Sequence, residues 1–109
     1  AALDLLANAR RAGLNIAVSQ TNVETWLETA GAAPDLVVAD PPRAGLGKAA
    51  VSRLLALRPP AIVLIACDPA TLARDLAALT SAYAIEKVTL ADLFPQTFHI
   101  ETIVSLRLR

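Results

Sequence analysis

Four polar side chains stand where short segments begin or end, and their types could carry out a reaction. Asp40 and Cys67 each end a short apolar run, Glu101 lies near the start of an alternating segment, and Asn22 lies at the start of a helical one. An ionised thiol is a nucleophile, and a carboxylate within hydrogen-bond reach can remove a proton. Joint chemistry requires a fold that brings these distant positions together.

Taken singly, the same residues have structural interpretations. A lone cysteine that ends an apolar strand is more often a small core residue than a nucleophile. Asp40 precedes two prolines and would close a turn, Asn22 is a typical helix-start residue, and Glu101 in an alternating strand would face solvent. The functional interpretation therefore depends on the elements that position them.

Cys67 precedes a segment with the features of a helix start. Pro69 suits the first turn, and Asp68 suits the N-cap. Unpaired amides and the positive end of the helix dipole would stabilise a thiolate there, whereas the negative charge of Asp68 would oppose it. The net effect does not follow from the sequence.

Hydrophobic periodicity and the placement of Gly and Pro predict alternating strands and helices. Helices are expected over 1–12, from a capping box at 21–24 to Gly31, over 47–57 and from Pro69 onward. Strands are expected over 15–19, 35–39, 61–66 (buried on both faces), 83–90 and 99–108. Such alternation predicts an α/β fold with a mostly parallel sheet. The connection before the last strand is too short for a helical crossover, so that strand should run antiparallel.

This topology places the candidate residues at one edge of the sheet. Ligands of open α/β sheets bind beyond the carboxyl ends of the parallel strands, where Asp40 and Cys67 fall. Glu101, near the start of an antiparallel strand, would lie at the same edge. A thiol and two carboxylates are thus expected to converge from distant parts of the chain.

Composition narrows the class of protein. A chain of 109 residues forms one small domain, and ten basic side chains cancel ten acidic ones, which does not favour an independent nucleic-acid-binding module. One cysteine excludes an internal disulfide and a cysteine-rich metal cluster. The longest apolar run, 61–67, is too short to span a membrane, and no signal peptide is recognised. We expect a cytoplasmic domain without a membrane contact.

Three segments give the chain a specific resemblance. They are Asp-Pro-Pro-Arg-Ala-Gly at 40–45, Ala-Cys-Asp-Pro-Ala-Thr-Leu-Ala-Arg-Asp at 66–75, and Asp-Leu-Phe-Pro-Gln-Thr-Phe-His-Ile-Glu at 92–101. In this order they resemble the carboxyl-terminal catalytic half of the bacterial RNA uracil-5-methyltransferases, which act on tRNA or 23S rRNA. The resemblance implies transfer of a methyl group from S-adenosylmethionine to carbon 5 of a uridine, through a covalent Cys–uracil intermediate.

The resemblance also implies a role for each candidate residue. Cys67 would be the nucleophile that adds to carbon 6 of uracil, and Glu101 the base that removes the proton from carbon 5. Asn22 and Asp40 would contact S-adenosylmethionine. These roles fit the chemistry, because carbon 5 becomes a competent nucleophile only after a thiolate adds at carbon 6.

Two other classes of function stay open at this point. Amino-group and cytosine-5 methyltransferases share parts of the pattern, but the former place an aromatic residue at the position of Arg43. The latter place their cysteine beside the proline of the fourth-strand loop, and no cysteine occurs there in this sequence. A non-catalytic α/β binding module is the alternative outside the enzymes.

Parts of the family pattern are missing. The sequence contains neither the Gly-rich loop after the first strand nor the acidic residue after the second. We therefore expect residues 1–109 to form the carboxyl-terminal part of a catalytic domain, a partial class I (Rossmann-like) methyltransferase sheet without the first two strands. Alone it should be inactive and bind the cofactor weakly or not at all. The bared edge of strand 35–40 should lead to self-association, and RNA contacts would depend mainly on other parts of the protein.

Overall fold

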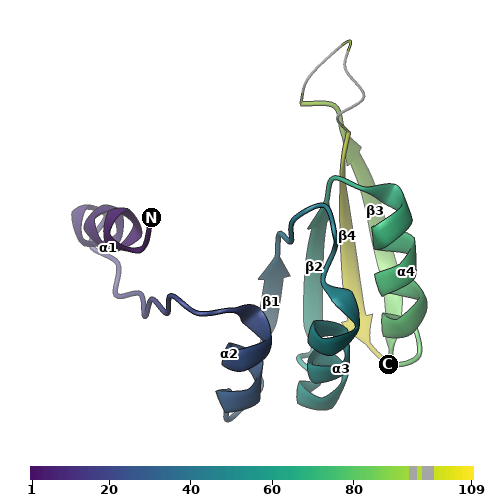
Figure 1. The fold of residues 1–109 in the computed structure, drawn as a ribbon, viewed down its shortest axis with the longest axis horizontal. Helices are drawn as coiled ribbons and strands as arrows, with labels where there is room; N and C mark the ends of the chain where they lie inside the picture. Colours follow the sequence, from purple (N-terminus) through teal and green to yellow (C-terminus); the bar gives the residue numbers. More distant parts are fainter. Residues whose placement is uncertain (94–95, 97–99) are drawn as a thin grey trace.

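The computed structural model describes residues 1–93, 96 and 100–109, and within them four strands form a sheet with the order β1-β2-β4-β3 (Figure 1). The strands are β1 (Leu36–Ala39), β2 (Ala61–Ala66), β3 (Tyr83–Ala91) and β4 (Glu101–Leu108). The helices are α1 (Ala2–Arg11), α2 (Val23–Thr29), α3 (Gly47–Leu57) and α4 (Pro69–Leu79).

The direction of the strands agrees with the sequence-based expectation. β1 and β2 pair in parallel, whereas β4 lies antiparallel between β2 and β3. The predicted α/β class and the antiparallel last strand are therefore confirmed. This order fits the carboxyl-terminal strands of the sheet that the resemblance implies.

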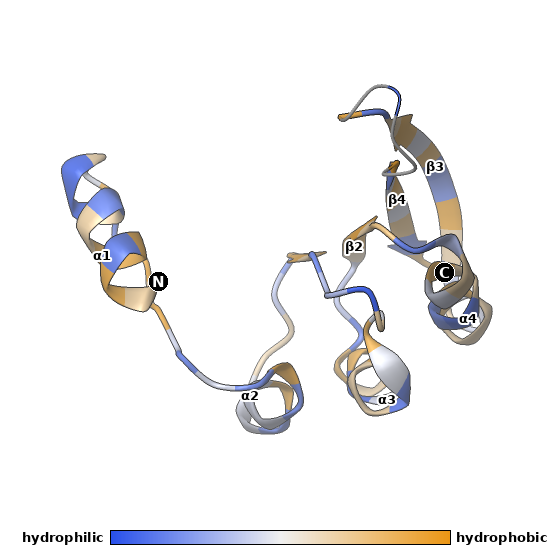
Figure 2. Ribbon diagram, turned by 45° about the horizontal axis from the view of Figure 1, so that its top comes forward, coloured by the Kyte–Doolittle hydropathy of each residue, from blue (hydrophilic) through white to orange (hydrophobic). Residues whose placement is uncertain are grey.

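Helices α2, α3 and α4 cover one face of the sheet (Figure 2). On that face the strands contribute fully buried side chains, whereas the alternate residues of β2 are only partly buried. The expectation that strand 61–66 is buried on both faces was therefore wrong, because within the described residues the helices cover a single face. The buried apolar core consists of Leu27, Ala50, Val51, Leu54, Ile62, Leu64, Ala66, Leu72, Leu79, Tyr83, Val104 and Leu106.

Two local predictions near the amino terminus were wrong. Residues 15–19 form no strand, because this linker to α1 runs apart from the sheet (Figure 1). The predicted capping box at 21–24 does not form; instead Asn22 is the N-cap of α2, and its side chain accepts a hydrogen bond from the Thr25 amide at 2.8 Å. Helix α2 ends at Thr29 with Ala30 as its C-cap, so Gly31 follows the helix end as predicted.

Near the carboxyl terminus, β4 begins at Glu101 rather than at residue 99. His99 and most of the connection before β4 lie outside the described residues. No helix among the described residues has both the length and the apolar character needed to cross a membrane.

The free edge of β1 leads to a prediction for the isolated chain. Leu36 and Val38 are 52% and 60% exposed, and within the described part of the chain β1 pairs with a strand on one side only. We propose that the 109-residue chain self-associates through this edge, since unpaired strand edges with apolar side chains template further pairing. Sedimentation at high concentration should show dimers or larger species, and Val38→Lys should shift them toward monomer. Leu3→Lys in α1 is the control, and a wild-type chain that sediments as a clean monomer contradicts the proposal.

A buried tyrosine ties β3 to the turn before β2. The Tyr83 hydroxyl donates a hydrogen bond of 2.7 Å to the carbonyl oxygen of Pro59, and the ring is fully buried. Burial raises the pKa of Tyr83 above its ordinary value of 10.0, and the positive charge of Arg58 partly opposes the rise. The folded state therefore favours the neutral phenol.

Replacing Tyr83 by phenylalanine should lower the free energy of unfolding by about 1–3 kcal/mol, because the Pro59 carbonyl loses its partner. The raised pKa makes the phenol's contribution to stability complete below pH 10, and this contribution disappears as the pH rises through the raised value. Urea denaturation at about pH 8 and about pH 11 should show a larger alkaline loss in the wild type than in the variant. Equal losses would contradict this explanation.

Candidate active site

Two loops meet at the carboxyl edge of the sheet, one after β1 and one after β2. Ala39 of β1 pairs with Leu64 of β2, so Asp40 lies just beyond the end of β1, and Cys67, just beyond the end of β2, is two residues farther along. Ala66 of β2 pairs with Thr102 of β4, and Cys67 and Glu101 are the next residues outward on these adjacent strands. Adjacent strands are about 5 Å apart. The backbone therefore places the three residues at the same end of the sheet, but Glu101 lines neither of the two cavities described below.

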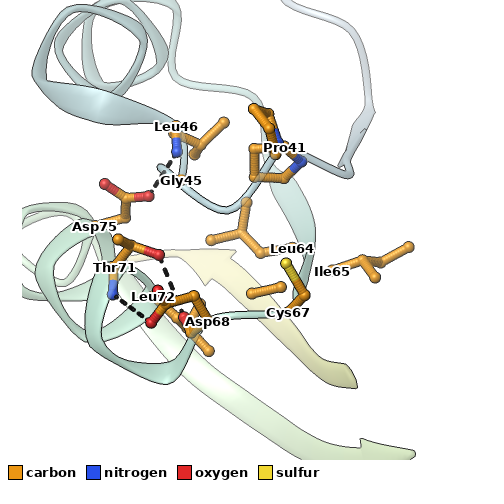
Figure 3. A pocket seen from close by; sticks show the side chains of 12 residues that line it. Pro41, Gly45, Leu46, Leu64, Ile65, Cys67, Asp68, Thr71, Leu72 and Asp75 are labelled. Atoms are coloured by element: carbon orange, nitrogen blue, oxygen red, sulfur yellow. Dashed lines mark hydrogen bonds between the residues drawn. The ribbon is translucent and has the colours of Figure 1, made fainter. Parts of the chain in front are cut away.

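A small pocket adjoins the cysteine. Its walls come from the loop after β1 and from the end of β2 with the first turns of α4, and the exposed thiol of Cys67 points toward the first loop (Figure 3). The lining residues are Pro41, Pro42, Gly45, Leu46, Leu64, Ile65, Ala66, Cys67, Asp68, Thr71, Leu72 and Asp75. Exposure of the thiol argues against the interpretation of Cys67 as a core residue.

Asp68 caps α4 as expected, and this cap determines whether the amides of α4 can stabilise a thiolate at Cys67. Its carboxylate accepts hydrogen bonds from the amides of Ala70 at 2.9 Å and Thr71 at 3.4 Å, and Pro69 has no amide hydrogen to offer. The free amides of the helix terminus are thus directed at Asp68. They are not available to Cys67, so the proposed stabilisation of a thiolate by these amides is wrong.

A second, larger groove contains both residues that the resemblance assigns to the cofactor. It encloses about 580 Å³ between α2 and the end of β1, and Asn22, Trp26 and Asp40 line it among mostly apolar neighbours. Ligand pockets of proteins commonly measure about 300–1,000 Å³, with a few polar groups on apolar walls. Size and lining therefore suit a largely apolar small molecule with a few polar groups.

The polar groups of this groove have capacity left for a ligand. The Asn22 side-chain oxygen is engaged by the Thr25 amide, which leaves the side-chain nitrogen as a donor. The carboxylate of Asp40 is exposed and can accept hydrogen bonds from hydroxyl or amino groups. A donor and an acceptor thus face the same groove.

The pocket and the groove share a wall. Pro41, Pro42, Gly45 and Leu46 line both, so a ligand in the groove and a base beside Cys67 would be separated by only one loop. The pocket measures only about 10 Å³, so an acceptor molecule would lie at its mouth against the exposed thiol, and the arrangement suits group transfer from the groove to that position. Among the described residues no cluster of three or more His, Cys, Asp or Glu could hold a metal ion.

Sequence reasoning missed three side chains of α4 that fasten the loop after β1. Thr71, Arg74 and Asp75 each make a hydrogen bond to its backbone. A signal was present for Asp75, because it lies three residues after Leu72 and four before Leu79, in the buried stripe of the helix. A carboxylate in an apolar stripe is rarely left without partners, and Asp75 is 4% exposed.

The fold is part of a Rossmann-like α/β sheet, with a groove and a pocket at the carboxyl ends of its parallel strands. The family model described as tRNA (Uracil-5-)-methyltransferase matches residues 10–109, and the chain belongs to this family.

Individual relatives agree with this assignment. An uncharacterized RNA methyltransferase of Thermosynechococcus vestitus is 42% identical over 104 residues, which are 93% of this chain and 23% of that protein. One of Bacillus anthracis is 37% identical over 110 residues, or 97% of this chain and 24% of that protein. The crystal structure of Pyrococcus abyssi tRNA (uracil-54, C5)-methyltransferase in complex with S-adenosyl-L-homocysteine matches with a TM-score of 0.84 and 31% identity. That match covers 96% of this chain and 26% of the other. The chain thus spans about a quarter of the length of these relatives.

Proposed function

We propose that residues 1–109 are the carboxyl-terminal part of the catalytic domain of an RNA uracil-5-methyltransferase. The observation that carries the proposal is the shared wall between the groove of Asn22 and Asp40 and the pocket of Cys67. Such an arrangement suits a methyl donor on one side and a target base on the other. The related Pyrococcus abyssi structure contains S-adenosyl-L-homocysteine, and we infer that the groove holds S-adenosylmethionine, which supplies the methyl group when bound.

The residues of the chain have separate tasks in this proposal. The thiolate of Cys67 forms a bond to carbon 6 of uracil, which moves electron density to carbon 5 and enables that carbon to accept the methyl group. Glu101, on the neighbouring strand, takes the proton from carbon 5. The C6–S bond then breaks and returns the thiolate. Asn22 and Asp40 orient the donor within the groove.

The partner in this proposal is RNA, either tRNA or 23S rRNA. A base within a helix cannot reach the pocket beside Cys67, so the target uridine must be unstacked and turned outward. The ten positive and ten negative charges of the chain leave it without the net positive charge on which backbone binding depends. We therefore assign most RNA affinity to other parts of the protein. A nucleophilic thiol also fits a reducing compartment, and we propose a cytoplasmic location.

The covalent step can be tested on the full-length protein with RNA that contains 5-fluorouridine. Thiolate addition and methyl transfer should proceed, but fluorine cannot leave carbon 5 as a proton, so the RNA should stay bonded to the protein. A denaturing gel should show this complex only when S-adenosylmethionine is present. Omission of the cofactor and RNA without fluorine are the controls. A full-length protein that methylates uridine without trapping the fluorinated RNA would refute the covalent mechanism.

The isolated chain should bind S-adenosylmethionine weakly or not at all. Its groove is built by α2, β1, α3 and the loop after β1, and the sequence lacks the Gly-rich loop that the family places around the cofactor. Trp26 is the only tryptophan, is 43% exposed and lines the groove, so its fluorescence reports binding directly. We expect no change at micromolar cofactor and no turnover. Micromolar affinity by calorimetry would contradict this expectation.

A further inference from the structure

Helix α4 is fastened to the loop after β1 at three successive points. The Thr71 hydroxyl donates to the carbonyl oxygen of Arg43 at 2.9 Å, and an Arg74 guanidinium nitrogen donates to that of Ala44 at 2.7 Å. The carboxylate of Asp75 accepts from the amide of Leu46 at 2.7 Å, as drawn in Figure 3. We call Thr71, Arg74 and Asp75 the clasp.

The clasp is rigid. Asp75 is 4% exposed, and its second oxygen accepts from two nitrogens of the Arg74 guanidinium at 3.2 and 3.0 Å. Leu46 is also the N-cap of α3, which has no side-chain cap of its own and no acidic residue in its first turn. The Asp75 carboxylate thus supplies the negative charge that the positive end of that helix favours.

Gly45 shows how closely the two parts approach. It has a left-handed backbone, with φ of 77°, and an added Cβ would lie 2.6 Å from a carboxylate oxygen of Asp75 and 2.8 Å from an Arg74 nitrogen. Gly47 also has a positive φ, of 83°, but an added Cβ there would meet nothing within 4 Å. At Gly45 both the positive φ and the contact with the clasp require glycine, whereas at Gly47 only the positive φ favours it.

The clasp joins the two halves of the site. The fastened loop begins directly after Asp40 and forms the shared wall of groove and pocket, while the clasp lies on the helix that follows Cys67. We propose that Thr71, Arg74 and Asp75 are positioning residues that fix the cofactor groove relative to the nucleophile. This inference rests on the proposed function. Misplacement of reacting groups by about 1 Å can cost on the order of 10²-fold in rate. Loss of the clasp should therefore lower the rate of methyl transfer more than it lowers cofactor affinity or the rate of thiolate addition.

Two measurements, one for each half of the site, distinguish a positioning role of the clasp from a role in protein stability. Without cofactor, addition of the Cys67 thiolate to carbon 6 lets solvent protonate carbon 5. Removal of the original hydrogen and loss of the thiolate then return uracil, so RNA tritiated at carbon 5 of uridine releases tritium into water. Cofactor affinity is measured by calorimetry, and methyl transfer requires both halves in register. These three quantities are measured on the full-length protein together with its melting temperature.

The first test compares Gly45→Ala with Gly47→Ala, since both place a Cβ on left-handed backbone but only the first meets the clasp. We expect kcat for methyl transfer to fall about 10- to 100-fold in Gly45→Ala relative to Gly47→Ala. Gly45 lines both the pocket and the groove, so tritium release and cofactor affinity should also fall in Gly45→Ala, but each by less than methyl transfer. Equal methyl transfer in the two variants, or a parallel fall of all three quantities, would overturn the proposal.

A milder pair covers the case in which Gly45→Ala does not fold. Thr71→Val removes the hydroxyl that reaches Arg43, and Thr80→Val removes one that bonds only within its own helix end, to Ala77. Methyl transfer should fall selectively in the first and not in the second. If the wild-type protein neither methylates RNA nor releases tritium, the proposed function itself is wrong and the positioning role falls with it. An active wild type with unselective variants refutes the clasp alone.

Discussion

Replacing Cys67 by alanine should abolish methylation and the covalent complex with 5-fluorouridine RNA in the full-length protein. Without the thiol no bond forms at carbon 6, and carbon 5 stays too weak a nucleophile to accept the methyl group. Loss of a covalent nucleophile commonly lowers turnover by about 10³-fold or more. Methyl incorporation from labelled S-adenosylmethionine and a denaturing gel measure the two effects.

The variant should fold and bind cofactor normally, which separates chemistry from stability. The Cys67 side chain is exposed, and surface substitutions usually change stability by less than about 0.5 kcal/mol. Cofactor affinity should also persist, because Cys67 lines the pocket and not the groove of Asn22 and Asp40. Ser81→Ala, at the opposite end of α4, is a suitable control. A Cys67→Ala protein that still traps fluorinated RNA would remove the nucleophile from this position.

Where local signals are strong, the sequence determines the elements closely. Pro59 and Pro60 cannot continue a helix, and an aliphatic run follows them, so the bounds of α3 and β2 were predicted correctly. Asp68 followed by Pro69 likewise marked the start of α4. These signals act within a few residues, and no distant partner is needed for them.

Where the outcome depends on distant partners, the sequence was insufficient. Residues 15–19 have strand-like composition but no neighbouring strand, and a strand forms only against a partner. The cap of α2 moved by one residue because Thr21 and Asn22 are both good capping residues. The periodic pattern could not show whether a partner strand is present for residues 15–19, or which of two residues caps α2.

The candidate site also has one part that the sequence predicted and another that it did not. Its convergence at one sheet edge followed from topology, since carboxyl ends of parallel strands share an edge and Glu101 begins the antiparallel one. The shared wall and the clasp could not be predicted from the sequence. Asp75 and Leu46, for example, are 29 positions apart and meet only after α3 and α4 pack. The clasp is a product of tertiary packing, with the buried carboxylate as its only trace in the pattern.

The second large effect concerns Glu101. Replacing it by glutamine should stall the full-length enzyme after methyl transfer, with ordinary RNA left covalently attached. The amide has nearly the same shape but cannot take the carbon-5 proton, and without that step the C6–S bond cannot break. Positioned bases commonly contribute about 10²–10⁴-fold, so turnover should fall by at least about 10²-fold. A burst of one methyl group per enzyme should remain.

The stalled complex distinguishes a base from a structural carboxylate. Cys67→Ala should give no covalent complex, whereas Glu101→Gln should accumulate one on unmodified uridine, and the double variant should give none. Glu86→Gln is the matched control on β3, because Glu86 is exposed and pairs with Arg107 at 2.8 Å. Exposed pairs of this kind contribute little, so that variant should turn over normally. If Glu101→Gln releases methylated RNA at the wild-type rate, another group removes the proton, and the register of Glu101 beside Cys67 is structural only.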